Sequence, residues 1–199
     1  MSKAVLISIR PQWCQKIASG EKTIEVRKTK PKLETPFKCY IYCTRDKHLA
    51  FMQNASGTNL IACMNAETAI PVGGAIGNGK VIGEFVCDCV TPLYNVCMDD
   101  WKRLAGGLHN VEKELVNQAC LTEAKLHTYA GGKNCFAWHI SDLKSYDAPK
   151  ELSEFRRATD PCDSCHAEYT WEYTDCKKWG GDIKRPPQSW CYVDDVQAK

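Results

Sequence analysis

Four polar side chains that could do chemistry lie close together near the N-terminus, at Lys22, Thr23, Glu25 and Arg27. The two cations are donors, and the arginine guanidinium can hold a phosphate or a carboxylate with two parallel hydrogen bonds. Glu25 can accept a hydrogen bond from a base amine or a hydroxyl, or it can act as a general base. In the structural alternative, Glu25 and Arg27 pair on a strand face and contribute about 0–1 kcal/mol. We favour the functional interpretation because Lys22 joins them at the same strand end.

These side chains are positioned by a predicted strand and by the turn before it. Ile24 and Val26 alternate with the polar residues at positions 23, 25 and 27, which is the period-two pattern of a strand. Gly20 can take a positive φ, so the preceding helix can stop there and the chain can reverse. That helix begins at Pro11. Its Trp13 can stack on a base near the polar cluster, or it can simply be the core residue of the helix.

Further strands and helices are predicted from periodicity along the chain. Strands are expected at 3–9, 37–44, 80–90 and 134–140, and helices at 99–104, 111–120 and from Thr122 to the glycine pair 131–132. In the second strand, Tyr40 and Tyr42 share the more polar face, where they can stack on bases or pack against a neighbouring element. Regular patterning ends near residue 141. Short strands around a few helices predict an α+β domain.

The cluster and its flanks resemble a known family. Gly20, Lys22, Glu25 and Arg27 match G-x-K-x-x-E-x-R, the signature of the ASCH domain family, and its flanks agree at 6–11, 83–85 and 137–140. The resemblance covers residues 3–145 and implies a small mixed β-barrel of PUA-like type with surrounding helices. We therefore predict an ASCH domain at 1–145 with an insertion at about 45–79, and a cysteine-containing extension at 146–199 that packs on the barrel.

The resemblance also implies the kind of ligand. ASCH domains are suspected of binding RNA or nucleotides, so we predict a pocket lined by the signature residues, with aromatic contacts from Trp13, Tyr40 or Tyr42. One branch of the family hydrolyses acetylated cytidine with a lysine, a nucleophilic threonine and a glutamate, and some relatives are reported as nucleases. Lys22 matches that lysine, but Glu25 occupies the threonine position. Lys22 and Glu25 are the catalytic candidates if the protein is a hydrolase of modified nucleosides or RNA.

Composition narrows the classes of function. The chain has 199 residues, of which 44% are hydrophobic and 25% charged, a typical globular composition. The net charge of +2 gives no large basic field, which favours a small or short ligand over one with many phosphates. It also permits a third class, a non-catalytic scaffold or nucleotide-sequestering protein. The apolar run at 4–9 is too short for a signal-peptide core, and we expect a cytoplasmic protein without a membrane partner.

Thirteen cysteines raise the question of a metal. In a reducing compartment most of them should be thiols. Cys162 and Cys165 form a C-x-x-C pair, Cys176 follows, and Zn²⁺ needs a fourth ligand, which would be His166 or Cys191. Such a zinc would be structural, since four protein ligands leave no open position. The alternative is a loop-rich tail with free thiols.

Overall fold

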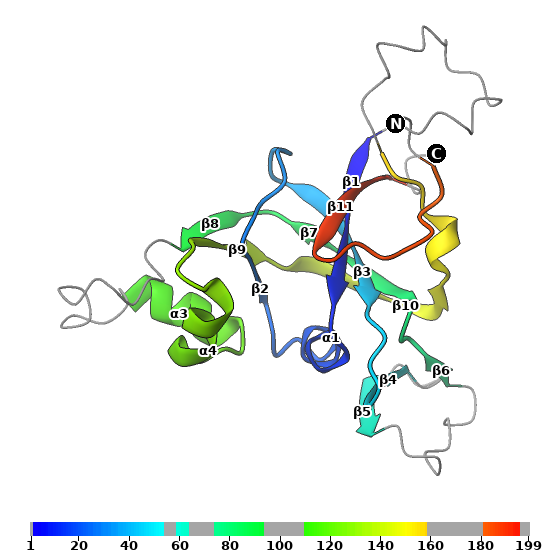
Figure 1. Cartoon of the computed structure of the whole chain (residues 1–199), viewed down its shortest axis with the longest axis horizontal. Coiled ribbons are helices and arrows are strands. Elements are labelled where there is room, and N and C mark those ends of the chain that lie inside the picture. Colours follow the sequence, from blue (N-terminus) through cyan, green and yellow to red (C-terminus); the bar gives the residue numbers. More distant parts are fainter. Residues whose placement is uncertain (1, 54–58, 64–73, 94–109, 159–180, 196–199) are drawn as a thin grey trace, which may run out of the picture. The chain divides into compact units, whose positions relative to one another are not determined.

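The structure is a computed structural model of the whole chain that describes residues 2–53, 59–63, 74–93, 110–158 and 181–195 (Figure 1). Contacts divide the chain into two compact units. Unit 1 comprises Met1–Gln15, Lys38–Glu84 and Lys144–Lys199, and unit 2 comprises Lys16–Phe37 and Phe85–Leu143. Both contain strands, and helices pack in unit 2, so the predicted α+β class is confirmed. No helix in the described residues is long and apolar enough to cross a membrane.

The large strands of unit 1 belong to a five-stranded sheet. Its order is β10-β7-β3-β1-β11, with β1 at Lys3–Ile9, β3 at Phe37–Cys43, β7 at Val81–Cys87, β10 at Ser141–Lys150 and β11 at Trp190–Asp194. The apolar run of β1 pairs with β3 in parallel and with β11 in antiparallel register, and Figure 1 shows β11 beside β1. The predicted strand at 3–9 is thereby confirmed.

The strand β10 is not predicted by the sequence, because its residues lack alternation. The position of β10 in the sheet is explained by its backbone pairing with β7. A Cβ on Gly83 of β7 would come within 2.5 Å of the Lys144 carbonyl oxygen, so the two strands can approach only where glycine stands. After β10, a short 3-10 helix at Leu152–Glu154 leads to Phe155, whose side chain is fully buried.

The exposure expected for one face of β3 is wrong, because this strand lies in the core of unit 1. We expected a half-exposed strand, but Tyr40 and Tyr42 are 0% and 3% exposed, so β3 is buried on both faces. The Tyr40 ring packs edge-on against Phe155, with 5.0 Å between centroids, and its hydroxyl donates to Asp195 Oδ1 at 2.7 Å. The tyrosines thus have the packing role that the sequence left open, because segments distant in the sequence cover what looked like a polar face.

The stretch predicted as an insertion contains a small sheet of its own. β4 (Leu49–Gln53) pairs with β5 (Asn59–Cys63) and β6 (Ala75–Ile76), both antiparallel. Asn78 holds β4 in place: its amide donates to the Leu49 carbonyl at 2.8 Å, and its side-chain oxygen accepts from the Phe51 N–H at 2.7 Å. Asn78 therefore organises the edge of this small sheet.

Unit 2 packs helices on a three-stranded antiparallel sheet. The strand order is β2 (Ile24–Arg27), β9 (Cys135–His139) and β8 (Val90–Leu93), and the helices are α3 (Asn110–Gln118) and α4 (Glu123–Ala130). The start of α4 is confirmed, since Thr122 Oγ1 accepts from the Lys125 N–H, and Gly131 ends the helix at φ 57°. Ile24 and Val26 pack in one cluster with residues of α3, α4 and β9.

Candidate functional site

The polar cluster lies in unit 2, at the entry to β2 and along it. Gly20 has φ 76°, and its N–H donates to the Ile17 carbonyl, so the reversal after α1 (Pro11–Ala18) forms as predicted. Glu25 and Arg27 are opposite Trp138 and Phe136 of β9, while Ile24 and Val26 pack against the helices. The polar and apolar side chains therefore occupy opposite faces of the strand, as the alternation predicts.

The Lys22 side chain is buried, and its ammonium group forms hydrogen bonds with the backbone of unit 2. Its side chain is 3% exposed, and its ammonium donates to the carbonyl oxygens of Ile24 at 2.7 Å and Ala119 at 2.8 Å. Ala119 directly follows α3, and the Thr23 N–H donates to the Gln118 carbonyl at 3.0 Å. The last carbonyls of α3 thus find donors at the start of β2, and a cation lies where the helix dipole is negative.

Glu25 joins the two cations. Its Oε2 lies 3.3 Å from Lys22 Nζ, and its Oε1 lies 2.9 Å from Arg27 Nε. Glu25 and Arg27 are 7% and 8% exposed, so the pairing weighed as the structural alternative is present, but it is a buried triad rather than an exposed pair. The triad thus holds two cations and one carboxylate within the strand face.

Two aromatic residues that the sequence analysis missed accompany this cluster. Burial raises the pKa of the Tyr129 hydroxyl, the Arg27 cation lowers it, and the Glu25 carboxylate raises it. Lys28 Nζ lies 5.3 Å from the Tyr129 ring centroid, and Lys30 Nζ lies 5.8 Å from that of Phe136. Both distances are in the cation–π range.

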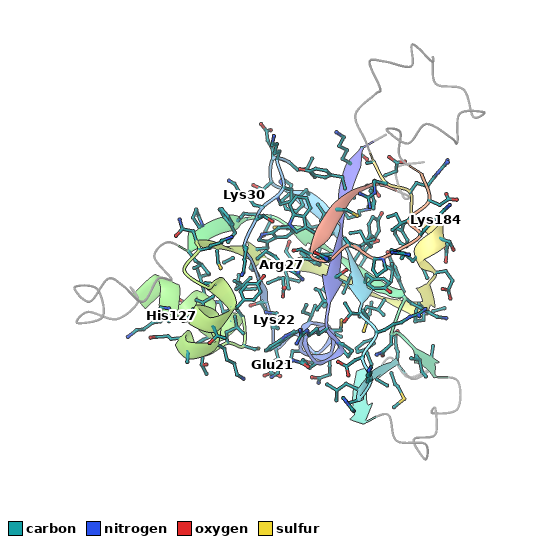
Figure 2. All side chains as sticks on the ribbon, in the orientation of Figure 1. Glu21, Lys22, Arg27, Lys30, His127 and Lys184 are labelled. Atoms are coloured by element: carbon teal, nitrogen blue, oxygen red, sulfur yellow. The ribbon has the colours of Figure 1, made fainter. Side chains whose placement is uncertain are left out.

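These residues form a basic, aromatic rim around the end of β2. Lys28 and Lys30 are exposed, Tyr129 is 40% exposed, and Phe136 is half-buried. Figure 2 shows Lys22, Arg27 and Lys30 following one another along this part of the unit. We call Lys28, Lys30, Tyr129 and Phe136 the rim. The only sequence signals for its aromatic members are a tyrosine two residues before a helix-ending glycine and an aromatic-rich strand.

The other predicted site residues fall elsewhere in the chain. Trp13, Tyr40 and Tyr42 belong to unit 1, and Trp13 is half-buried on α1. Thr23 is held by its backbone, which accepts from the Ile140 N–H at 2.9 Å. Cys191 is a half-buried thiol in β11, and burial raises its pKa. The other predicted zinc ligands, Cys162, Cys165, His166 and Cys176, lie outside the described residues.

The arrangement favours binding over nucleophilic chemistry. The three donors of the Lys22 ammonium are directed at two carbonyls and a carboxylate, so this group has no donor left for a reacting atom. Glu25 is likewise held between two cations. The cluster therefore holds its charged groups in fixed positions, in the same unit as the lysines and aromatic rings of the rim.

Comparison with known proteins supports the fold. No protein-family profile matches the chain, and no curated protein matches it in sequence. Among solved structures, the ASCH protein of Zymomonas mobilis is similar, with a TM-score of 0.51, 18% identity, and coverage of 96% of this chain and 88% of that one. A tyrosine-to-phenylalanine variant of that protein gives a TM-score of 0.51 and 19% identity over 98% and 92%. The chain therefore has an α+β fold similar to that of this ASCH protein.

Proposed function

We propose that this protein is a non-catalytic module that binds single-stranded RNA or a nucleotide-like ligand at the rim, next to Arg27 at the end of β2. The observation that carries this proposal is the placement of Lys28 and Lys30 over the rings of Tyr129 and Phe136. Proteins that bind single strands combine cations along the backbone path with aromatic rings on which bases stack.

The charges agree with a short ligand. Lys28 and Lys30 contribute two positive charges on the same unit as the triad. A strand of a few nucleotides would match this local charge, while the net charge of +2 for the whole chain provides no wider basic field. The likeness to ASCH domains in fold is consistent with this assignment but does not by itself name a ligand.

The test is a fluorescence anisotropy titration of the full chain with a labelled single-stranded RNA at several salt concentrations. Each lysine that contacts a phosphate contributes about 0.7 to the slope of log K against log salt for a single strand. The Lys28→Gln, Lys30→Gln double variant should therefore lose about 1.4 from the slope. Tyr129→Ala should weaken binding by about 1–3 kcal/mol, the contribution of one stacked base.

Lys125→Gln is the matched control, because this lysine is exposed in the same unit but is not part of the rim. It should bind as the wild type does. Equal affinities for the wild type and the double variant would refute the rim as the site. An unlabelled mononucleotide that competes fully would narrow the ligand to a nucleotide. Release of acetate from acetylated cytidine by the purified chain would instead assign it to the hydrolases.

A further inference from the structure

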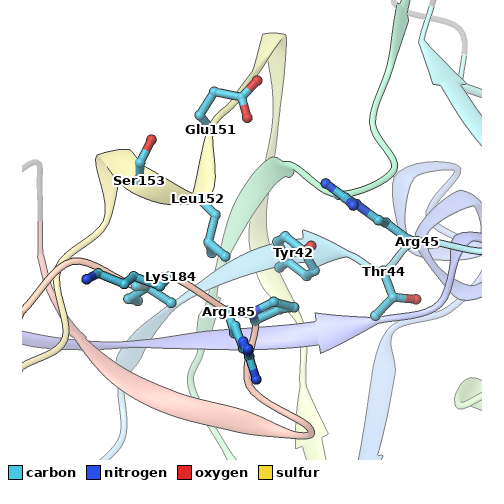
Figure 3. A pocket seen from close by; sticks show the side chains of 11 residues that line it. Tyr42, Thr44, Arg45, Glu151, Leu152, Ser153, Lys184 and Arg185 are labelled. Atoms are coloured by element: carbon cyan, nitrogen blue, oxygen red, sulfur yellow. The ribbon is translucent and has the colours of Figure 1, made fainter.

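Unit 1 contains a cavity of about 660 Å³ that the proposed function does not use. Its lining residues all belong to unit 1 and come from four places: the end of β3 with the two residues after it, Gly79, the start of the 3-10 helix with the residue before it, and residues 183–186 (Figure 3). None of them belongs to the rim, so a ligand of this cavity would use a different surface.

Three exposed cations, Arg45, Lys184 and Arg185, lie around this cavity. Figure 3 shows their charged ends pointing in different directions, so a single compact anion is not shared between them. In the described part of the chain, none of the three lies within ion-pair distance of a carboxylate. The carboxylate in the lining, Glu151, is paired with Lys80 at 2.9 Å. A ligand that uses all three cations must therefore carry several anionic groups that are set apart from one another.

Part of the lining is apolar. Leu152, Ile183 and Pro186 contribute to it, and Figure 3 shows the Leu152 side chain directed toward the ring of Tyr42. The Tyr42 ring is 3% exposed, so it offers little surface on which a base could stack. Nucleic acid strands are bound through stacking as well as through phosphate contacts. The lining therefore favours a ligand with aliphatic groups between its anionic groups over a strand of nucleotides.

The backbone beside the cavity has hydrogen-bonding groups that the fold does not use. Among the described residues, the N–H and C=O groups of Lys184 and Arg185 find no hydrogen-bond partner, whereas the preceding Ile183 N–H donates to the Phe155 carbonyl at 3.4 Å. Arg185 also precedes Pro186, which disfavours a helical conformation for it. An extended peptide can pair its main chain with such groups, and side-chain pockets then supply specificity.

From this geometry we propose that unit 1 docks an extended acidic peptide segment of a partner protein at this cavity. Separate carboxylates of the peptide pair with Arg45, Lys184 and Arg185, and an aliphatic side chain between them contacts Leu152 and Ile183. The complementary charges select the partner and speed its association, while the main chain and the aliphatic side chain provide most of the affinity.

The experiment is an anisotropy titration of the full chain with a fluorescein-labelled peptide that has aspartates and glutamates on both sides of a leucine. One control peptide has amides in place of the carboxylates, and another has glycine in place of the leucine. The acidic peptide should bind less tightly as salt rises, and both control peptides should bind about tenfold more weakly or worse. No binding of the acidic peptide, equal binding of the amide peptide, or its full displacement by oligouridylate RNA would overturn the proposal.

Variants connect the binding to the named cations. The double variant Arg45→Gln, Arg185→Gln should bind the acidic peptide about tenfold more weakly, since each exposed ion pair contributes up to about fivefold. The double variant Lys47→Gln, Lys144→Gln is the matched control, because it removes the same charge from exposed residues of unit 1 that do not line the cavity. Equal binding by these two variants, with unchanged amide spectra of the free proteins, would show that the peptide is not bound here. The double variant of the rim lysines should bind the peptide as the wild type does, and a loss there would assign the peptide to the rim instead.

Discussion

Replacing Lys22 by methionine would test whether its ammonium group stabilises unit 2. Methionine keeps an apolar stem but removes the donors to the Ile24 and Ala119 carbonyls, which lie at 2.7 and 2.8 Å. Hydrogen bonds to a charged group contribute about 1.5–3 kcal/mol each. Breaking a buried ion pair costs about 3–5 kcal/mol when the partner is left alone, but here Glu25 keeps Arg27 at 2.9 Å. We expect the free energy of unfolding to fall by about 3–5 kcal/mol, mainly through the two carbonyls.

This loss is measurable because folded proteins are stable by only about 5–15 kcal/mol. For a chain of this size, 1 kcal/mol corresponds to about 2–4 °C in Tm, so Lys22→Met should lower Tm by roughly 6–20 °C in a calorimetric scan. Lys125→Met, at an exposed position in the same unit, should change the free energy of unfolding by about 0.5 kcal/mol or less. A Lys22→Met protein within about 1 kcal/mol of the wild type would refute the assignment of Lys22 as a stabilising residue.

Three further predictions follow from the same structure. Arg27→Ala should weaken RNA or nucleotide binding by about 1.5–3 kcal/mol in the anisotropy assay, with the fold kept because Lys22 still faces Glu25; unchanged affinity would remove Arg27 from the site. Burial raises the pKa of Cys87 to about 12, so the unfolded thiol loses its proton first and the free energy of unfolding should fall as pH rises from 9 toward 12. Urea denaturation should show a smaller fall for Cys87→Ala, and equal pH profiles would contradict this. Metal analysis of protein purified without added zinc should give one equivalent, lost in Cys→Ser variants, if the predicted ligands bind; under a tenth of an equivalent would reject the site at Cys162, Cys165 and Cys176 with His166 or Cys191.

The elements that the sequence predicts well are those whose pattern is local. The segment at 3–9 is predicted as a buried strand because most of its residues are apolar, and α4 is bounded by a capping threonine and a helix-ending glycine. Gly20 and the alternation of β2 fix the turn and the two faces of the strand in the same way. In each case the residues that decide the conformation lie within one or two turns of the place they determine.

What the sequence does not predict depends on partners distant in the chain. Tyr40 alternates with apolar residues and looks exposed, but Phe155 and Asp195, more than a hundred residues later, cover its ring and bind its hydroxyl. Phe136 joins the site only because β9 pairs with β2 in the register that sets it opposite Arg27. From the sequence alone, Lys22 looks available to a ligand, but in the fold its ammonium donates to the Ala119 carbonyl.

The triad suggests a division of roles within the spaced pattern of Lys22, Glu25 and Arg27. Lys22 is bound to the carbonyl that follows α3 and to Glu25, so its position depends on the fold of unit 2 and not on a ligand. The carboxylate of Glu25 is paired with both cations. Arg27 is at the end of the strand next to Lys28, whose ammonium lies over the Tyr129 ring. We therefore expect a ligand to contact the rim. Substitutions at Lys22 should have a larger effect on the free energy of unfolding than on ligand affinity.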